Sequence, residues 1–405
     1  MEAYEPTNRI TKTFIELLQI ALGNRKALSS PCTDEEWKDV YDVAKRQAMT
    51  GIIFYAISQL PAEEMPPVKL KGIWAMTTLQ IEEMNKRMSR ECCIATEFLA
   101  EAGLHSCILK GQSNLFLYPH ELRMLRIPGD IDIWTFKETA TGGSKSHRSD
   151  IVRIVWDKTG KHSEVTVHHI ECNLFPKTAV EVHFVPSFAI NPFMDKKYRR
   201  WYESHKNEIL PTKAGFNILN THFNLIFQMM HIYRHLLLEG IGFRQLTDLY
   251  FTLLSRSRMA ETTKERRYDK DFIYRELCDL GMKRITEAVM WLMQSVLSMD
   301  EKHLICAPSE KYGREMLSEM MRGGNFGKYY KSTDTPILPS QHRPKKKAVA
   351  GKKKSFISKK IAGFYDFLEG CKHGSRLLTS YPKEVLWIPY LYIKASFVRN
   401  YWRLQ

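Results

Sequence analysis

The chain has 405 residues, of which 44% are hydrophobic, and a formal net charge of +15. This length and hydrophobic content are sufficient to bury the cores of two or more domains. No run of about 20 apolar residues occurs and the N-terminus is acidic and polar, so we expect no transmembrane helix, no signal peptide and a cytoplasmic location.

Residues 1–104 are predicted to form an N-terminal helical region. Apolar residues recur with a helical period from about residue 8, and Thr33 is a typical N-cap for a helix that begins with three acidic residues. A long helix is expected from about residue 70 to 102. It leads into segment 105–190, which contains all of the strand candidates and is predicted to be an α/β core.

Residues 191–335 are predicted to form a helical domain, with helices near residues 217–238, 246–254 and 274–297. A basic linker or loop, 336–360, would connect this domain to a helical and aromatic C-terminal segment, 361–405. The sequence therefore predicts an α+β fold, in which a small mixed β-sheet is flanked by N- and C-terminal helical segments.

The most informative motif is the segment Pro128–Trp134, in which two aspartates stand two residues apart on a predicted strand. Side chains alternate between the faces of a strand, so Asp130 and Asp132 point the same way while the isoleucines point into a core. Two like charges ~4 Å apart repel by about 4 kcal/mol at an effective dielectric near 20. A divalent cation commonly offsets such repulsion; the alternative is a strand end with two solvated acids.

A glycine turn precedes this pair. The apolar run His105–Leu109 ends at Lys110 and Gly111, and a helix is expected to begin shortly afterwards. A strand that breaks at glycine and opens a helix presents free backbone N–H groups, which suit a phosphate. Gly111 would let the phosphate approach the backbone, and Ser113 could donate its hydroxyl. Many such turns are only connections, but beside an aspartate pair this one indicates a nucleotide-and-metal site.

A third acid lies on another predicted strand, Thr178–Phe184, where Glu181 and His183 share one face. If this strand lies beside the aspartate strand, Glu181 completes a three-carboxylate cluster. Such clusters supply the oxygen ligands with which Mg²⁺ binds substrate phosphates. The alternative for Glu181 is an exposed acid on an edge strand. His183 is predicted to be a hydrogen-bonded histidine beside the site rather than a metal ligand.

Together these motifs resemble the bacterial uncharacterised nucleotidyltransferase family, within the polymerase-β-like superfamily. The resemblance is carried by Leu109–Gly111, Leu117–Pro119, Arg123, Gly129–Asp132, His168 with His169, and Val180–Ser187. It extends through Asn191–Phe193 and Gly242–Asp248 and covers roughly residues 10 to 330. In that superfamily a glycine-serine turn holds the triphosphate, an Asp-x-Asp pair binds two metal ions, and a third acid is metal ligand and base.

The resemblance implies a role for each matching residue. Asp130, Asp132 and Glu181 would be catalytic and would hold Mg²⁺ or Mn²⁺. The residues that would contact the nucleoside triphosphate are Lys110, Gly111, Ser113, Arg123 and Gly129. The chain departs from the pattern because Gln112 interrupts the glycine-serine turn, the distance from Ser113 to Asp130 is long, and the third acid is a glutamate.

The implied reaction moves a nucleoside monophosphate from the NTP to an acceptor hydroxyl and releases pyrophosphate. The acceptor could be a small molecule, RNA or a protein, and the identity of the NTP stays open. Arg126 is a further candidate to neutralise phosphate charge, although Lys110 and Arg126 could equally form a solvated basic face. An alternative is a nucleotide-binding regulatory protein that is catalytically weak or inactive.

Another alternative is an adaptor that contacts nucleic acid or a membrane surface through residues 343–360. This segment has one arginine, eight lysines and no acid, and so carries +9 of the formal +15. Such a segment could grip an anionic surface electrostatically or could be a solvated loop. The aromatic C-terminal segment could lie in a membrane interface or pack back on the domain.

The remaining polar motifs are predicted to be structural. His168 and His169 lie on a predicted strand, so alternation should send one of them inward. Arg244 and Asp248 are spaced i, i+4 and are predicted to form a helix-surface pair worth a few tenths of a kcal/mol, although a role near the nucleotide is possible.

His231 and His235 are also spaced i, i+4, and are predicted to be satisfied helix histidines rather than zinc ligands. The eight cysteines form no Cys-x-x-Cys pair, so we expect them to be reduced and mostly buried.

Overall fold

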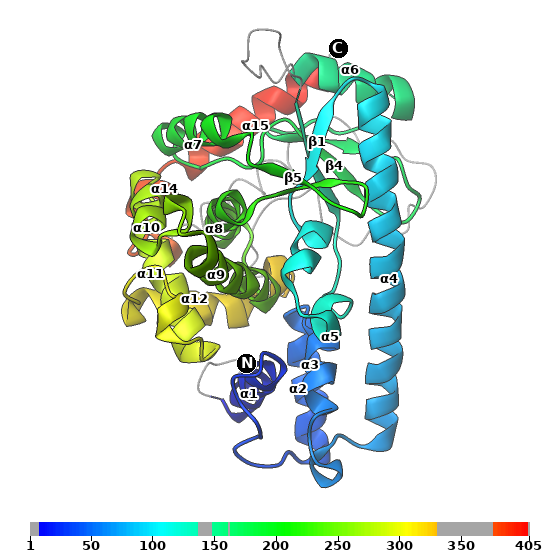
Figure 1. The fold of residues 1–405 in the computed structure, drawn as a ribbon, viewed down its shortest axis with the longest axis vertical. Coiled ribbons are helices and arrows are strands. Elements are labelled where there is room, and N and C mark those ends of the chain that lie inside the picture. Colours follow the sequence, from blue (N-terminus) through cyan, green and yellow to red (C-terminus); the bar gives the residue numbers. More distant parts are fainter. Residues whose placement is uncertain (1–7, 137–147, 161–162, 330–375, 404–405) are drawn as a thin grey trace.

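The computed structural model describes residues 8–136, 148–160, 163–329 and 376–403 (Figure 1). They form an α+β fold with one six-stranded mixed sheet and flanking helices, as predicted. The basic segment 343–360 lies outside the described residues. Within those described ranges, no helix combines the length and the apolar character that crossing a membrane requires.

The N-terminal region is helical, and comprises α1 (Arg9–Ala21), α2 (Asp34–Arg46), α3 (Thr50–Ile57) and α4 (Val68–Glu101). Thr33 begins α2 as predicted: its hydroxyl accepts from the N–H of Glu36, whose carboxylate accepts from the N–H of Thr33. The long helix α4 runs along one side of the molecule, from the N-terminal helices to the sheet (Figure 1). It covers one face of the sheet.

The sheet has the strand order β3-β4-β2-β1-β6-β5. Its strands are β1 (His105–Ile108), β2 (Ile131–Phe136), β3 (His169–Cys172), β4 (Val180–His183), β5 (Ile209–Pro211) and β6 (Asn217–Leu219). β2 pairs antiparallel with β1 and parallel with β4, and this register sets Asp132 opposite Glu181. The two strands therefore lie side by side, which is the condition that a three-carboxylate cluster requires.

The last two strands, β5 and β6, fall in a region that was predicted to be helical, so that prediction was wrong. Each has only three residues, which is too short to show alternation in the sequence. The helix predicted from residue 217 begins instead at Thr221, because the side chain of Asn220 accepts from the N–H of Phe223 and caps it there.

The two faces of β2 have different surroundings. Ile131 and Ile133 face a core formed with α4 and with α6 (Arg148–Thr159). Trp134, on the opposite face, packs edge-on against Phe223 of α8 (Thr221–Leu238) at 5.8 Å between ring centroids. Asp132 shares this second face, because residues two apart on a strand point the same way.

The remaining helices are α5 (His120–Arg123), α7 (Pro192–His205), α8 (Thr221–Leu238), α9 (Phe243–Thr263), α10 (Lys270–Asp279), α11 (Lys283–Trp291), α12 (Glu310–Gly323), α14 (Pro382–Val385) and α15 (Ile388–Arg403). The single helix predicted over 274–297 was wrong. Gly281, with a φ of +80°, separates α10 from α11, and a π-helical turn follows α11.

The described part of the C-terminal segment packs back on the rest of the chain. Trp402 of α15 lies edge-on to Trp156 of α6, with 5.7 Å between ring centroids, and Trp387 lies 5.9 Å from Phe193 of α7. Of the two alternatives for this segment, these contacts favour packing on the domain.

A histidine-glutamate network joins α7, α8 and α10. The imidazole of His222, which is 1% exposed, lies 3.2 Å from a carboxylate oxygen of Glu208 and 2.7 Å from one of Glu276. Burial lowers the pKa of His222, but the two hydrogen-bonded glutamates outweigh it and raise the pKa to about 9. Trp201 of α7 donates to Glu276 and ties the third helix to the network.

Seven of the eight cysteines lie in the described residues, and none of these seven forms a disulfide. Three of them are buried, namely Cys92, Cys107 and Cys172, while the other four are half-buried. The prediction that the cysteines are mostly buried was therefore wrong for these four, which lie on helices or loops at the edge of the core.

Candidate functional site

The three predicted carboxylates converge. Asp130 lies directly before β2, Asp132 lies within it, and Glu181 lies opposite Asp132 on β4. One carboxylate oxygen from each of the three lies within 4.8 Å of the others. Asp132 and Glu181 are buried and Asp130 is half-buried, so the cluster is reached from the Asp130 side.

Lys110 offsets part of this negative charge. Its ammonium lies 3.4 Å from Oδ1 of Asp130 and 3.0 Å from Oδ2 of Asp132. Burial lowers the pKa of Lys110, but the nearby carboxylates outweigh burial and raise the pKa above its ordinary value. The alternative of a solvated basic face is therefore wrong for Lys110.

His183 lies beside the carboxylates, as predicted. Its Nε2 is 3.0 Å from Oδ1 of Asp132 and 3.4 Å from Oε2 of Glu181. Burial lowers the pKa of His183, but the hydrogen bonds to the two acids outweigh it and raise the pKa. His183 thus helps Lys110 to balance the charge of the cluster.

Both His168 and His169 are buried, so the expectation that only one would point inward was wrong. The strand begins at His169, and His168 lies on the bend before it, where strand alternation does not apply. Nδ1 of His169 is 3.1 Å from Oε2 of Glu181, whereas Nε2 of His168 lies 2.6 Å from a guanidinium nitrogen of Arg234. Burial, followed by neighbouring positive groups, lowers the pKa of both histidines.

The glycine turn differs from the prediction in its details. Gly111 has a φ of +63°, a conformation that favours glycine, and it lines the cavity beside Asp130. The helix that follows, Gly111–Leu117, is a 3₁₀ helix in which Ser113 is buried. Ser113 lines neither of the two hollows described below, the small cavity and the larger cleft. The amide of Gln112 donates to the backbone carbonyl of Asn85 on α4, so this extra residue fixes the turn to the long helix.

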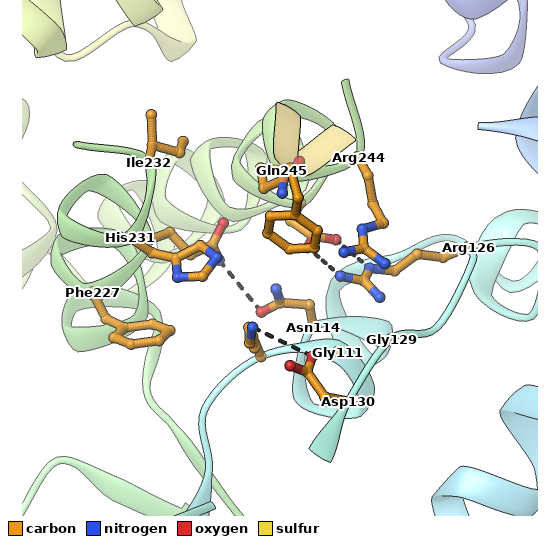
Figure 2. Close-up of a pocket in the computed structure, with 14 residues that line it drawn as sticks. Gly111, Asn114, Arg126, Gly129, Asp130, Phe227, His231, Ile232, Arg244 and Gln245 are labelled. Carbon is orange, nitrogen blue, oxygen red and sulfur yellow. Dashed lines mark hydrogen bonds and ion pairs between the residues drawn. The ribbon is translucent and has the colours of Figure 1, made fainter. Parts of the chain in front are cut away.

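A small cavity of about 20 Å³ lies between this turn and the helices α8 and α9 (Figure 2). Figure 2 shows Asn114, Asp130 and His231 pointing toward it from three separate segments of the chain. Oδ1 of Asn114 accepts from Asn224 and Gln228 of α8, at 3.1 and 3.4 Å. Asn114 thus lines this cavity, whereas Ser113 does not, and no motif in the sequence pointed to Asn114. The phosphate contact of Ser113 stays a prediction.

Arg244 and Asp248 do not form a helix-surface pair, because both are buried and Asp248 has another partner. Nε and Nη2 of Arg126 each lie 2.6 Å from a carboxylate oxygen of Asp248, and the hydroxyl of Tyr118 donates to Oδ1 at 2.7 Å. Arg126 is 4% exposed, so the solvated alternative is also wrong for this residue.

Arg244 lies at the cavity, where it donates to the carbonyl of Ile127 at 3.1 Å. Burial, together with the positive charge of Arg126, lowers the pKa of Arg244 to about 10. A Cβ on Gly129 would lie 3.3 Å from Nη1 of Arg244, so glycine permits this approach. Arg123 is half-buried on α5 and lines neither cavity; its phosphate contact stays a prediction.

A larger cleft of about 1140 Å³ opens onto Asp130 and Glu181. Its walls come from α2, α4, the turn between β3 and β4, and the segment 325–329. Five basic residues line it, namely Lys45, Arg46, Lys177, Arg244 and Lys328. A cleft with carboxylates at one end and basic groups along its walls suits a substrate that carries phosphates.

Phe326 is a site residue that the sequence analysis missed. It lines both the cavity and the cleft, and its ring lies 5.8 Å from the ammonium of Lys110 and 5.1 Å from the guanidinium of Arg244. Its φ of +57° is unusual for a bulky side chain. The glycine-rich sequence around it, Gly323–Gly327, was the available signal for an irregular turn.

Residues 33–298 match the model of a family described as uncharacterised nucleotidyltransferase. The chain belongs to this family. The matched segment of the nucleotidyltransferase contains Lys110 and the three carboxylates, whereas Phe326 lies beyond it. No curated protein and no solved structure gives a significant match.

Proposed function

We propose that this nucleotidyltransferase is metal-dependent and polymerase-β-like, and that it moves a nucleoside monophosphate from an NTP to an acceptor hydroxyl with release of pyrophosphate. The observation that carries the proposal is the convergence of three carboxylates within 4.8 Å, two on paired strands and one directly before β2, beside a glycine turn and a basic cleft. Family membership supports the class of reaction.

The donor set fits the metal that the proposal needs. Asp130, Asp132 and Glu181 offer carboxylate oxygens, which Mg²⁺ and Mn²⁺ prefer, and one oxygen of each lies close enough to share an ion. When bound there, the ion supplies Lewis-acid stabilisation of phosphate charge and a lowered pKa of the attacking hydroxyl.

Lys110 and Arg244 bind the triphosphate in this proposal. Lys110 exchanges the carboxylates of Asp130 and Asp132 for phosphate oxygens, and Arg244 already lies at the same cavity. The left-handed turn at Gly111 lets the phosphates approach the backbone. These groups neutralise the charge that develops as the bond between the α-phosphorus and the leaving pyrophosphate oxygen breaks.

Glu181 takes the proton of the attacking hydroxyl as the new bond between oxygen and α-phosphorus forms. The acceptor enters through the large cleft, which reaches Glu181 directly. Its volume of about 1140 Å³ exceeds the ~300–1000 Å³ typical of a pocket for one small ligand, so donor and acceptor can lie in it together.

The test is label transfer. The protein is incubated with each α-labelled NTP, Mg²⁺ or Mn²⁺ and cell extract, and labelled products are separated. Wild type and Asp157→Asn, which changes an exposed aspartate on α6, should transfer label, whereas Asp130→Asn with Asp132→Asn should not. Equal labelling by wild type and the double variant contradicts the catalytic assignment. Nucleotide binding without transfer to any acceptor supports the regulatory alternative.

A further inference from the structure

A second donor cluster lies beside the carboxylates, on β3 and β4. The antiparallel register sets His169 opposite His183, and Glu181 precedes His183 by two residues on the same face. The three residues are 0%, 3% and 8% exposed, in that order. Because the donors come from paired strands, the backbone ladder fixes their relative positions, as a binding site requires.

The donor atoms have the spacing of ligands around a single ion. Nδ1 of His169 is 3.1 Å from Oε2 of Glu181, and Nε2 of His183 is 3.4 Å from the same oxygen. Ligands bound at 2.0–2.2 Å in a tetrahedral site lie about 3.4 Å from one another. One donor atom of each residue, with one of His168, falls within 4.8 Å of all the others.

His168 is excluded from the ligand set because its Nε2 has another partner. Nη1 of Arg234 lies 2.6 Å from Nε2 of His168, and since a guanidinium only donates, the lone pair of this nitrogen is already used. The positive charge of Arg234 also makes this side of the cluster unfavourable for a cation. Two imidazoles and one carboxylate remain.

The geometry points to a binding position for a transition-metal ion of the Zn²⁺ class, formed by His169, His183 and Glu181. Imidazole nitrogens suit Zn²⁺ and related ions, whereas Mg²⁺ takes oxygen ligands. Two histidines with one glutamate are the protein ligands of some catalytic zinc sites, which keep a further position open. This inference rests on the proposed function only because Glu181 belongs both to the carboxylate cluster and to this histidine cluster.

Asp132 lies between the two positions, since its Oδ1 is 3.0 Å from Nε2 of His183. The site would therefore hold two ions of different chemistry side by side: one among carboxylate oxygens, which Mg²⁺ can occupy, and one at the histidines, which Mg²⁺ does not displace. Retention of zinc in excess Mg²⁺ is the distinguishing property.

The test measures metal binding rather than turnover. Full-length protein is stripped with a chelator and dialysed against Zn²⁺ in a large excess of Mg²⁺, and bound zinc is counted by elemental mass spectrometry. Wild type should retain one zinc per chain, and His169→Gln or His183→Gln should weaken binding by more than about 100-fold. His303→Gln, which changes a half-buried histidine outside the cluster, and Asp130→Asn, which alters only the carboxylate cluster, should retain the zinc.

X-ray absorption at the zinc edge of the wild-type protein gives a readout that does not depend on the folding of any variant. Scattering from two imidazole rings is expected. An oxygen-only shell, or equal zinc retention by wild type and both histidine variants, overturns the inference. Zinc held by two imidazoles without label transfer from any NTP contradicts the proposed function and leaves the zinc position intact.

Discussion

Asp248 is the residue whose substitution tests the interior of the site most directly. It is 5% exposed, and its carboxylate receives two charge-assisted hydrogen bonds from Arg126 and one from the hydroxyl of Tyr118. Asp248→Asn keeps the volume and removes the charge, so it leaves the guanidinium of Arg126 buried without a counter-ion, close to a second buried arginine.

The size of the effect distinguishes two environments. A helix-surface pair at i, i+4 contributes about 0.2–0.5 kcal/mol. Removal of one partner from a buried pair costs about 3–5 kcal/mol, because the remaining charge stays desolvated. Both distances between Arg126 and Asp248 are 2.6 Å, and both side chains are buried, so we expect Asp248→Asn to lower the free energy of unfolding by about 3–5 kcal/mol.

Equilibrium unfolding in urea measures this change, and two further variants separate its causes. Tyr118→Phe removes only the neutral donor and should cost about 0.5–1.5 kcal/mol. In an Arg126→Met background no guanidinium is left unpaired, so Asp248→Asn should cost far less than in wild type. A loss below about 0.5 kcal/mol for Asp248→Asn in wild type, or the same loss in both backgrounds, would refute the buried ion pair.

Three further predictions concern other parts of the chain. Lys110→Met should strengthen Mn²⁺ binding in the absence of nucleotide, measured by electron paramagnetic resonance, because the ammonium no longer competes for the carboxylates. Gly51→Ala should lower the free energy of unfolding by at least about 1–3 kcal/mol, since its Cβ would lie 2.4 Å from the carbonyl oxygen of Leu125. Gly72→Ala, at an exposed and open helix position, should instead raise the free energy of unfolding by about 0.5–1 kcal/mol. The pKa of His222 is raised to about 9, so its stabilisation of about 3 kcal/mol is complete below pH ~6.5 and is lost as pH rises through about 9. Urea unfolding across this range should show the loss in wild type and not in His222→Gln.

The carboxylate cluster could be predicted because it depends on short-range rules. Asp130 and Asp132 share a face through strand alternation, and Glu181 was found on a strand with the same pattern. The pairing of the two strands could only be assumed from the sequence. The register that sets Asp132 opposite Glu181 shows that the two strands do pair. Strand alternation and one correct assumption about sheet order were therefore sufficient to predict the carboxylate cluster.

The interactions that were missed join residues that are far apart in the chain. The i, i+4 rule favoured Arg244 as the partner of Asp248, but the buried partner is Arg126, more than a hundred residues earlier. Phe326 reaches the site from beyond the matched family segment, through a turn with unusual backbone conformation. Such pairings follow from how helices pack on the sheet, which residue spacing does not encode.

Lys110 connects metal binding to nucleotide binding. Its ammonium lies 3.0–3.4 Å from two of the three carboxylates, in the place where their charge attracts any cation. A divalent ion 4 Å from the ammonium would repel it by about 8 kcal/mol at an effective dielectric of 20, so metal binding alone must displace a well-paired lysine. A triphosphate supplies an alternative partner for that lysine. Metal and nucleotide should therefore bind with positive cooperativity, and Lys110→Met should reduce this cooperativity while increasing the affinity for metal alone.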